Sequence, residues 1–143
     1  MTQPYDVVHA SRQYQDWLAA LKQEASLVTH NQSQAMMRAV MHELRSCLGP
    51  DDVLRVANAL PALPRGILLE GWSLSDRVST PATADAFHEG VFERIKAHHT
   101  PPADIVPATF RVWQRFLDRR DAAIIEECLP DALKPVWPPT DER

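Results

Sequence analysis

Apolar residues recur along the chain at steps of three and four, the spacing that places side chains on one face of a helix. The longest such stripe predicts a first helix over residues 7–25, with Asp6 as its N-cap. A polar loop is expected at 29–33. A second stripe then predicts a helix over about 34–48. The chain therefore begins as a run of amphipathic helices.

Glycine and proline mark the ends of the next elements. Gly49 suits the end of the second helix, and Pro50 suits the first turn of the helix after it. We expect this third helix over about 52–59, where the Leu-Pro pair at 60–61 ends it. A short fourth helix is predicted over about 64–70.

A stretch with little apolar content, residues 73–82, follows and is the best candidate for a linker. Thr80 and Pro81 are expected to be the N-cap and first residue of a fifth helix. Pro107 either falls in the first turn of the sixth helix or kinks it. Residues 138–143 are expected to be a frayed tail. The remaining stripes predict helices over about 81–98, 104–117, 120–128 and 131–137.

The two halves of the chain match when the second is shifted back by 69 positions. Apolar positions then coincide through several helices, and the Leu-Pro pair at 60–61 falls on the pair at 129–130. We therefore predict an all-α protein of about eight helices. They would form one compact domain of two tandem four-helix repeats, about 7–72 and 83–137, packed around one shared core.

The segment Met37–Trp72, which contains Leu60-Pro61 and the run Arg-Gly-Ile-Leu-Leu-Glu-Gly-Trp, resembles the bacterial family called domain of unknown function 2267. The resemblance extends over roughly residues 17–137. It implies paired helical segments and supplies no catalytic residues. The second half departs from the family pattern at Pro107 and at Asp118-Arg119.

Composition and charge narrow the class of protein. The chain has 143 residues, 45% of them hydrophobic, and a net charge of −4, so no overall field attracts nucleic acid or an anionic membrane. Cys47 and Cys128 lie in apolar helical patterns and are expected to be free core residues. With no signal peptide or membrane span in the pattern, we expect a cytoplasmic protein without membrane association.

No arrangement of residues typical of an enzyme is found in the sequence. Asp85, His88 and Glu89 share one helical turn, but no second matching cluster accompanies them, so a solvated face is favoured over a metal site. There is no Gly-x-Ser-x-Gly motif, and 4 glycines leave no phosphate-binding loop. We expect a protein that is not an enzyme and that needs no cofactor or metal.

Arginines at helical spacing form a candidate basic face, Arg111, Arg115 and Arg119. Such a face could contact phosphates in a divergent DNA-binding module. Asp118 and Asp121 interrupt it, however, which favours an ion-paired, solvated face.

Tryptophans offer the best candidates for binding. Trp72 and Trp137 end the two predicted repeats, and either could be core residues or exposed anchors. With Arg65 and Glu70 they form the candidate interaction or cleft residues. The leading hypothesis is a non-enzymatic interaction or regulatory module that binds a protein partner or a second copy of itself. The alternative is a small-molecule binder with an apolar cleft lined by Trp72, Met41 and Trp113.

Overall fold

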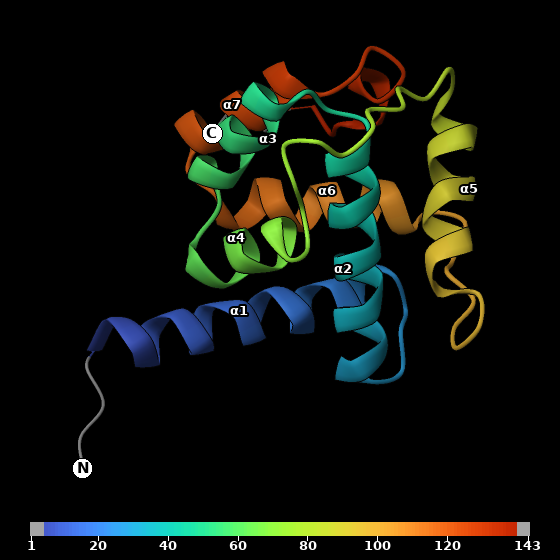
Figure 1. Cartoon of the computed structure of the whole chain (residues 1–143). Coiled ribbons are helices and arrows are strands. Elements are labelled where there is room, and N and C mark those ends of the chain that lie inside the picture. Colours follow the sequence, from blue (N-terminus) through green and yellow to red (C-terminus); the bar gives the residue numbers. More distant parts are fainter. Residues whose placement is uncertain (1–4, 140–143) are drawn as a thin grey trace.

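A computed structural model describes residues 5–139, and over that range the protein is all-helical (Figure 1). Seven α-helices and one short 3₁₀ turn occur in this part of the chain, with no strand. Their bounds are α1 Tyr5–Glu24, α2 His30–Ser46, α3 Pro50–Ala59, α4 Ala62–Leu69, α5 Ala84–Ile95, α6 Ile105–Phe116, α7 Arg119–Cys128 and the 3₁₀ turn Lys134–Val136.

Helix starts in the first half differ from prediction where a cap was misjudged. α2 begins at His30, within the predicted loop, because Thr29 and Gln32 form a capping box. The Thr29 hydroxyl accepts from the Gln32 backbone N–H at 3.1 Å, and the Gln32 side chain accepts from the Thr29 N–H at 3.2 Å. The predicted N-cap role of Asp6 is wrong, because Asp6 lies inside α1.

In the second half, too, the start of each helix depends on which residue precedes its first turn. α5 begins after Thr83, whose hydroxyl accepts from the Ala86 N–H at 3.0 Å, so the predicted cap at Thr80 is wrong. α6 begins after Asp104. Pro107 therefore falls in the first turn of α6, where its missing N–H would have had no helical acceptor. Of the two alternatives for Pro107, the first is confirmed.

The expected eighth helix is reduced to the turn Lys134–Val136. Pro135 lacks a backbone donor, and Pro130 and Pro138 restrict the chain on either side, so a full α-helical turn does not propagate. Pro138 is held to the body of the protein, because its carbonyl accepts from Gln114 Nε2 at 2.9 Å. The rest of the predicted tail lies largely outside the described residues.

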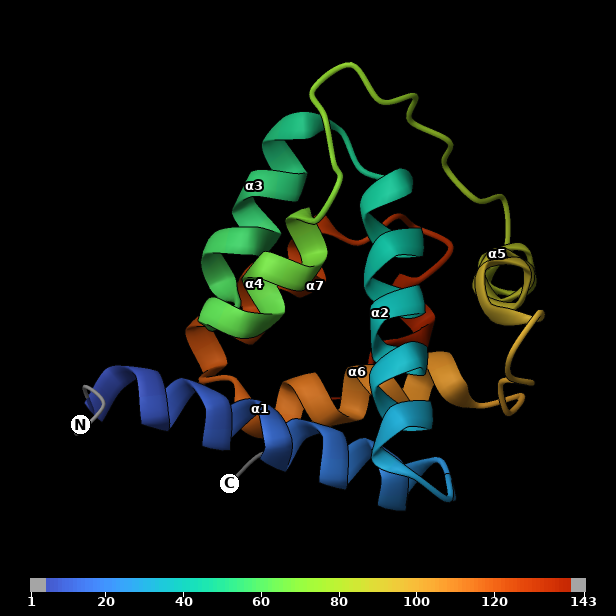
Figure 2. The ribbon, with the colours of Figure 1, turned by 60° about the horizontal axis from the view of Figure 1, so that its bottom comes forward.

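The helices pack through a central pair, α2 and α6, that receives contacts from both halves. α1 packs against both α2 and α6, whereas α5 packs against α2. α3 lies beside α7 and α4, so elements far apart in sequence are neighbours (Figure 2). The buried apolar residues of all seven α-helices form one cluster. In Figure 2, α5 stands at the edge of the molecule, reached by the long segment 70–83.

The largest side chains confirm the predicted core. Trp17 and Trp113 are fully buried, and Trp137 is 5% exposed with its ring centroid 5.4 Å from that of Phe110. The indole N–H groups of Trp17 and Trp113 have no hydrogen-bond acceptor within residues 5–139. Trp72 differs from the other three, because it is only partly buried at the edge of the core.

Candidate functional site

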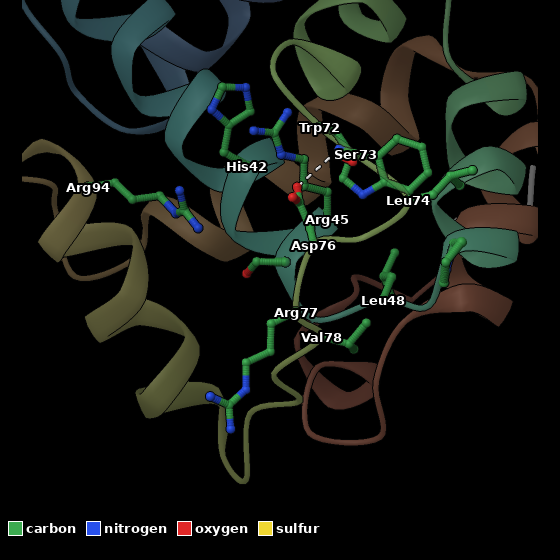
Figure 3. A pocket seen from close by; sticks show the side chains of 12 residues that line it. His42, Arg45, Leu48, Trp72, Ser73, Leu74, Asp76, Arg77, Val78 and Arg94 are labelled. Atoms are coloured by element: carbon green, nitrogen blue, oxygen red, sulfur yellow. Dashed lines mark hydrogen bonds between the residues drawn. The ribbon is translucent and has the colours of Figure 1, made fainter.

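A surface hollow of about 300 Å³ lies where α2, the segment after α4 and α5 come together (Figure 3). α2 supplies His42, Arg45 and Ser46 from its last turns. The segment after α4 supplies a second wall, and Arg94 reaches in from α5. The full lining is His42, Arg45, Ser46, Leu48, Pro50, Trp72, Ser73, Leu74, Asp76, Arg77, Val78 and Arg94.

Cationic side chains of α2 join it to the end of α4. Arg45 Nη1 donates to the Leu68 carbonyl at 2.7 Å and also to the carbonyl of Glu70. These carbonyls lie at the helix C-terminus, where a cation is favoured by the helix dipole. Arg38 forms an ion pair with the Glu70 carboxylate. Arginine contacts from α2 therefore fix the end of α4, and one of these arginines, Arg45, also lines the hollow.

The surroundings of His42 fix its hydrogen bonding and lower its pKa. Its Nε2 lies 2.8 Å from the Ile67 carbonyl, and a carbonyl can only accept, so this nitrogen carries the proton. Burial is the main cause that lowers the pKa of His42, and the nearby charges of Arg45, Arg38 and Arg94 lower it further. The hydrogen bond to Ile67 acts in the opposite direction without overcoming these effects.

Arg94 is held across the α2–α5 contact by Glu43. Its Nε donates to Glu43 Oε2 at 2.7 Å. Glu43 fits against α5 because Gly90 has no side chain: a Cβ at position 90 would stand 2.2 Å from Glu43 Oε1. Gly90 therefore makes room for the one ion pair that joins α2 to α5 within residues 5–139.

The outer wall carries exposed apolar side chains. Leu74 is 68% exposed and lies near the partly buried Trp72, whereas Val78 is 44% exposed and lies farther along the segment, near Leu48. Gly71 adopts φ +72°, a left-handed conformation that turns the chain sharply out of α4. Farther along, the Ser79 N–H donates to the Ser46 carbonyl at 2.9 Å and fixes the segment against the end of α2.

Comparison with known families matches residues 14–136 to the model described as "Uncharacterized conserved protein (DUF2267)". The chain belongs to the DUF2267 family. This confirms the resemblance to this family, which was expected over roughly residues 17–137. No match to a curated protein was found for this DUF2267 chain.

The four candidate interaction residues of this DUF2267 protein occupy different settings. Trp72 lines the hollow, whereas Glu70 does not line it and is paired with Arg38. Arg65 instead caps α3: its Nε donates to the Ala57 carbonyl at 2.8 Å and its Nη2 to the Leu60 carbonyl at 2.9 Å. Trp137 is buried against Phe110 and offers no surface to a partner.

The structure does not bring Trp72, Met41 and Trp113 together in the apolar cleft suggested as an alternative. Met41 and Trp113 are fully buried in the core, whereas Trp72 lies at the surface. A second, shallower hollow of about 350 Å³ lies elsewhere, between Arg65 and Asp121. Neither of the two hollows is lined by Met41 or Trp113.

One arginine of the candidate basic face, Arg111, is paired with carboxylates. Arg111 Nε donates to Glu24 at 3.1 Å, and its Nη2 lies 3.8 Å from Asp104. The Arg115 guanidinium lies over the Phe116 ring at 5.2 Å. Arg119 is exposed at the start of α7. The contacts of Arg111 fit the ion-paired interpretation of this face.

Within residues 5–139 no group of three or more histidine, cysteine or acidic side chains could hold a metal ion. Cys47 and Cys128 are free and buried, as predicted. Burial raises the pKa of Cys47 to about 12 and that of Cys128 to about 11, so both thiols stay protonated at neutral pH. No helix in the described range is long and apolar enough to cross a membrane.

Sequence reasoning missed most of the hollow. His42, Arg45 and Arg94 lie on the polar faces of predicted helices, where nothing distinguishes them from solvated side chains. Leu74 and Val78 are isolated apolar residues in a polar segment. One signal was available, since these two residues and Arg77 follow Trp72 inside a linker that is otherwise largely polar.

Proposed function

We propose that this protein is a non-enzymatic interaction module that binds another protein through the surface formed by Trp72, Leu74, Arg77 and Val78, here called the 72–78 surface. The observation that carries the proposal is the exposure of Leu74 and Val78 in the segment that begins at Trp72, which internal hydrogen bonds hold in place. Tryptophan and arginine are the residue types enriched where interfaces gain most of their binding energy.

The 72–78 surface is ordered before any partner arrives. The Ser73 N–H donates to Asp76 Oδ2 at 3.1 Å, which closes a local turn, and Ser79 is bonded to the end of α2. A surface that is already ordered loses less conformational entropy on binding, so more of the contact energy appears as affinity. These hydrogen bonds thus favour a role for residues 72–78 in binding a partner over a role as a linker alone.

The proposal is tested by placing a charge on the 72–78 surface. Leu74→Asp should abolish capture of a specific partner from extracts of the native host, because a carboxylate at the centre of an interface is desolvated without a counterion. Val28→Asp is the matched control, since Val28 is 76% exposed in the α1–α2 loop, outside the 72–78 surface.

Direct binding then decides the outcome. The captured protein is purified, and its affinity is measured by calorimetry against the wild type and both variants. Sedimentation of the wild type and both variants at several concentrations tests a second copy of this chain as the partner. Equal binding or equal self-association by all three proteins would overturn the proposal.

We further propose that the fold consists of two related helical repeats: residues 7–72, with four α-helices, and residues 83–137, in which the 3₁₀ turn takes the place of the fourth. Its support is the pattern of exchanged contacts: α1 packs on α6 as α5 packs on α2, and α3 packs on α7. α3 and α7 also both end at a Leu-Pro pair. An experimental structure in which α1–α3 superimpose poorly on α5–α7 would contradict it.

A cytoplasmic location in a bacterial cell is likewise our proposal. Two buried thiols that remain unpaired suit a reducing compartment. Fractionation of native cells should recover the protein with cytoplasmic markers, and recovery with periplasmic or membrane markers would contradict the proposal.

A further inference from the structure

The hollow beside α2 is positively charged within an acidic protein. Three arginines and one aspartate line it, Arg45, Arg77, Arg94 and Asp76, so its lining carries two positive charges in excess. The whole chain carries a net charge of −4. A local charge opposite to that of the surrounding protein is the electrostatic setting that attracts a small anion to one place.

The guanidinium groups retain unused donors. Among the protein contacts of residues 5–139, Arg45 donates through Nη1 alone, to backbone carbonyls. Arg94 donates through Nε alone, to Glu43. An arginine carries five N–H donors in a fixed fork, so the remaining donors of both side chains are available to a ligand.

The two arginines also act on each other. Figure 3 shows Arg94 extending from α5 toward His42 and Arg45, while Arg77 lies at the rim and points away from them. Burial lowers the pKa of Arg45, and the charge of Arg94 lowers it further. A bound anion between Arg45 and Arg94 would offset this like-charge repulsion.

An apolar wall faces the cationic one. Trp72, Leu74 and Leu48 line the same hollow, and Trp72 presents a flat ring beside Arg45 in Figure 3. The volume of about 300 Å³ is at the lower end of the range for small-molecule sites. A ligand that fits both walls has one anionic group and one compact apolar body.

We propose that this hollow binds a small organic oxyanion, a carboxylate or a phosphate monoester, whose charged group lies between Arg45 and Arg94 and whose apolar body packs on Trp72. This ligand site goes beyond the docking of a protein and does not depend on it. The site is distinct from the apolar cleft expected from the sequence, because its specificity comes from arginine donors.

The test uses phenyl phosphate and benzoate as probes, with benzyl alcohol as the uncharged analogue. Each is titrated into the full-length protein while NMR follows the Trp72 indole N–H and the Arg94 Nε–H. Saturable shifts of both signals are expected with at least one anion, and none with benzyl alcohol. Saturation by neither anion, or equal saturation by benzyl alcohol, would overturn the proposal.

Variants of the two partners in the Glu43–Arg94 ion pair should change the affinity for the anion in opposite directions. Arg94→Gln should weaken anion binding about tenfold, because a charge-assisted hydrogen bond is lost. Glu43→Gln should tighten binding, because it removes the carboxylate that competes for Arg94. Arg120→Gln changes the net charge as Arg94→Gln does, but at an exposed residue of α7 that does not line the hollow.

These variants separate a site from general attraction to a charged surface. Thermal melting first establishes that each variant is folded. If Arg94→Gln and Arg120→Gln weaken binding equally, or if Glu43→Gln weakens it, the assignment of Arg94 as an anion ligand is wrong.

Discussion

Arg45 and Arg65 perform the same task at different helix ends. Arg45 donates to the carbonyls that close α4, and Arg65 donates to those that close α3. Last-turn carbonyls lack the regular i+4 donors of the helix interior, so each guanidinium supplies hydrogen bonds where the helix itself supplies few. The two arginines differ in the hollow that they line. Arg45 lines the hollow beside α2, whereas Arg65 lines the second, shallower hollow beside Asp121.

His42 should make the stability of the protein depend on pH. Its pKa is lowered in the folded state, so below about pH 6.5 the unfolded chain binds more protons, and the free energy of unfolding falls as the pH falls. Urea unfolding at pH 7.5 and pH 5 should show a larger loss for the wild type than for His42→Gln. The difference should stay below about 1 kcal/mol, because His42 is only half-buried and solvent screens its charge. Parallel pH profiles would contradict the assignment.

Gly90 and Glu43 should be energetically coupled. Gly90→Ala gains up to about 1 kcal/mol of helix propensity, but its Cβ displaces the Glu43 carboxylate from Arg94. In a Glu43→Ala background that displacement costs nothing, so the same change should stabilise the protein more. Chemical denaturation of the four proteins measures the coupling, which we expect to be about 0.5–1 kcal/mol. Additive effects would show that Glu43 moves aside freely.

Among the elements, α5 has the least support, because it packs on α2 along one face and is reached by the long segment 70–83. Its buried face comprises Phe87, Val91 and Ile95. Arg94, one wall of the hollow, therefore depends on how firmly α5 is seated. Interactions that start α5 in the correct place are thus relevant to the site as well as to stability.

The cap of α5 gives a prediction at this scale. Thr83→Ala should lower the free energy of unfolding by about 1 kcal/mol, because it removes the acceptor for the Ala86 N–H. Thr80→Ala is the matched control, because Thr80 lies in the extended segment before the helix and should change stability by less than about 0.5 kcal/mol. Urea unfolding compares them, and a larger effect at Thr80 would place the start of α5 where the sequence suggested.

At the scale of the whole molecule, α3 and α7 join the two halves of the chain through one core. Ile125 of α7 is fully buried, and Arg55 of α3 pairs with Glu127 of α7 at 2.9 Å. Ile125→Ala should therefore lower the free energy of unfolding by about 2–5 kcal/mol and affect both halves together. Far-UV circular dichroism and tryptophan fluorescence should report a single, coincident transition. Separate transitions would show that the halves unfold independently.

The helices were predictable because buried positions repeat every three to four residues. This periodicity is visible in the order of apolar residues alone, without any knowledge of contacts. Trp113 and Ile125 are core residues by pattern and by structure. Caps such as Thr29 and Thr83 were misplaced, because several polar residues near each helix start could accept the first N–H groups. The hollow was not predictable, because Arg45 and Arg94 come together only through the packing of α5 on α2.

The unequal burial of the four tryptophans makes the protein its own optical reporter. The indole rings of Trp17 and Trp113 are fully buried, and that of Trp137 is nearly so. The fluorescence emission of these three residues should therefore be blue-shifted and insensitive to the quencher acrylamide. Trp72 alone lies where a quencher can reach it, at the wall of the hollow. A change in the quenchable fraction of the emission therefore monitors occupancy of that hollow directly, without a label.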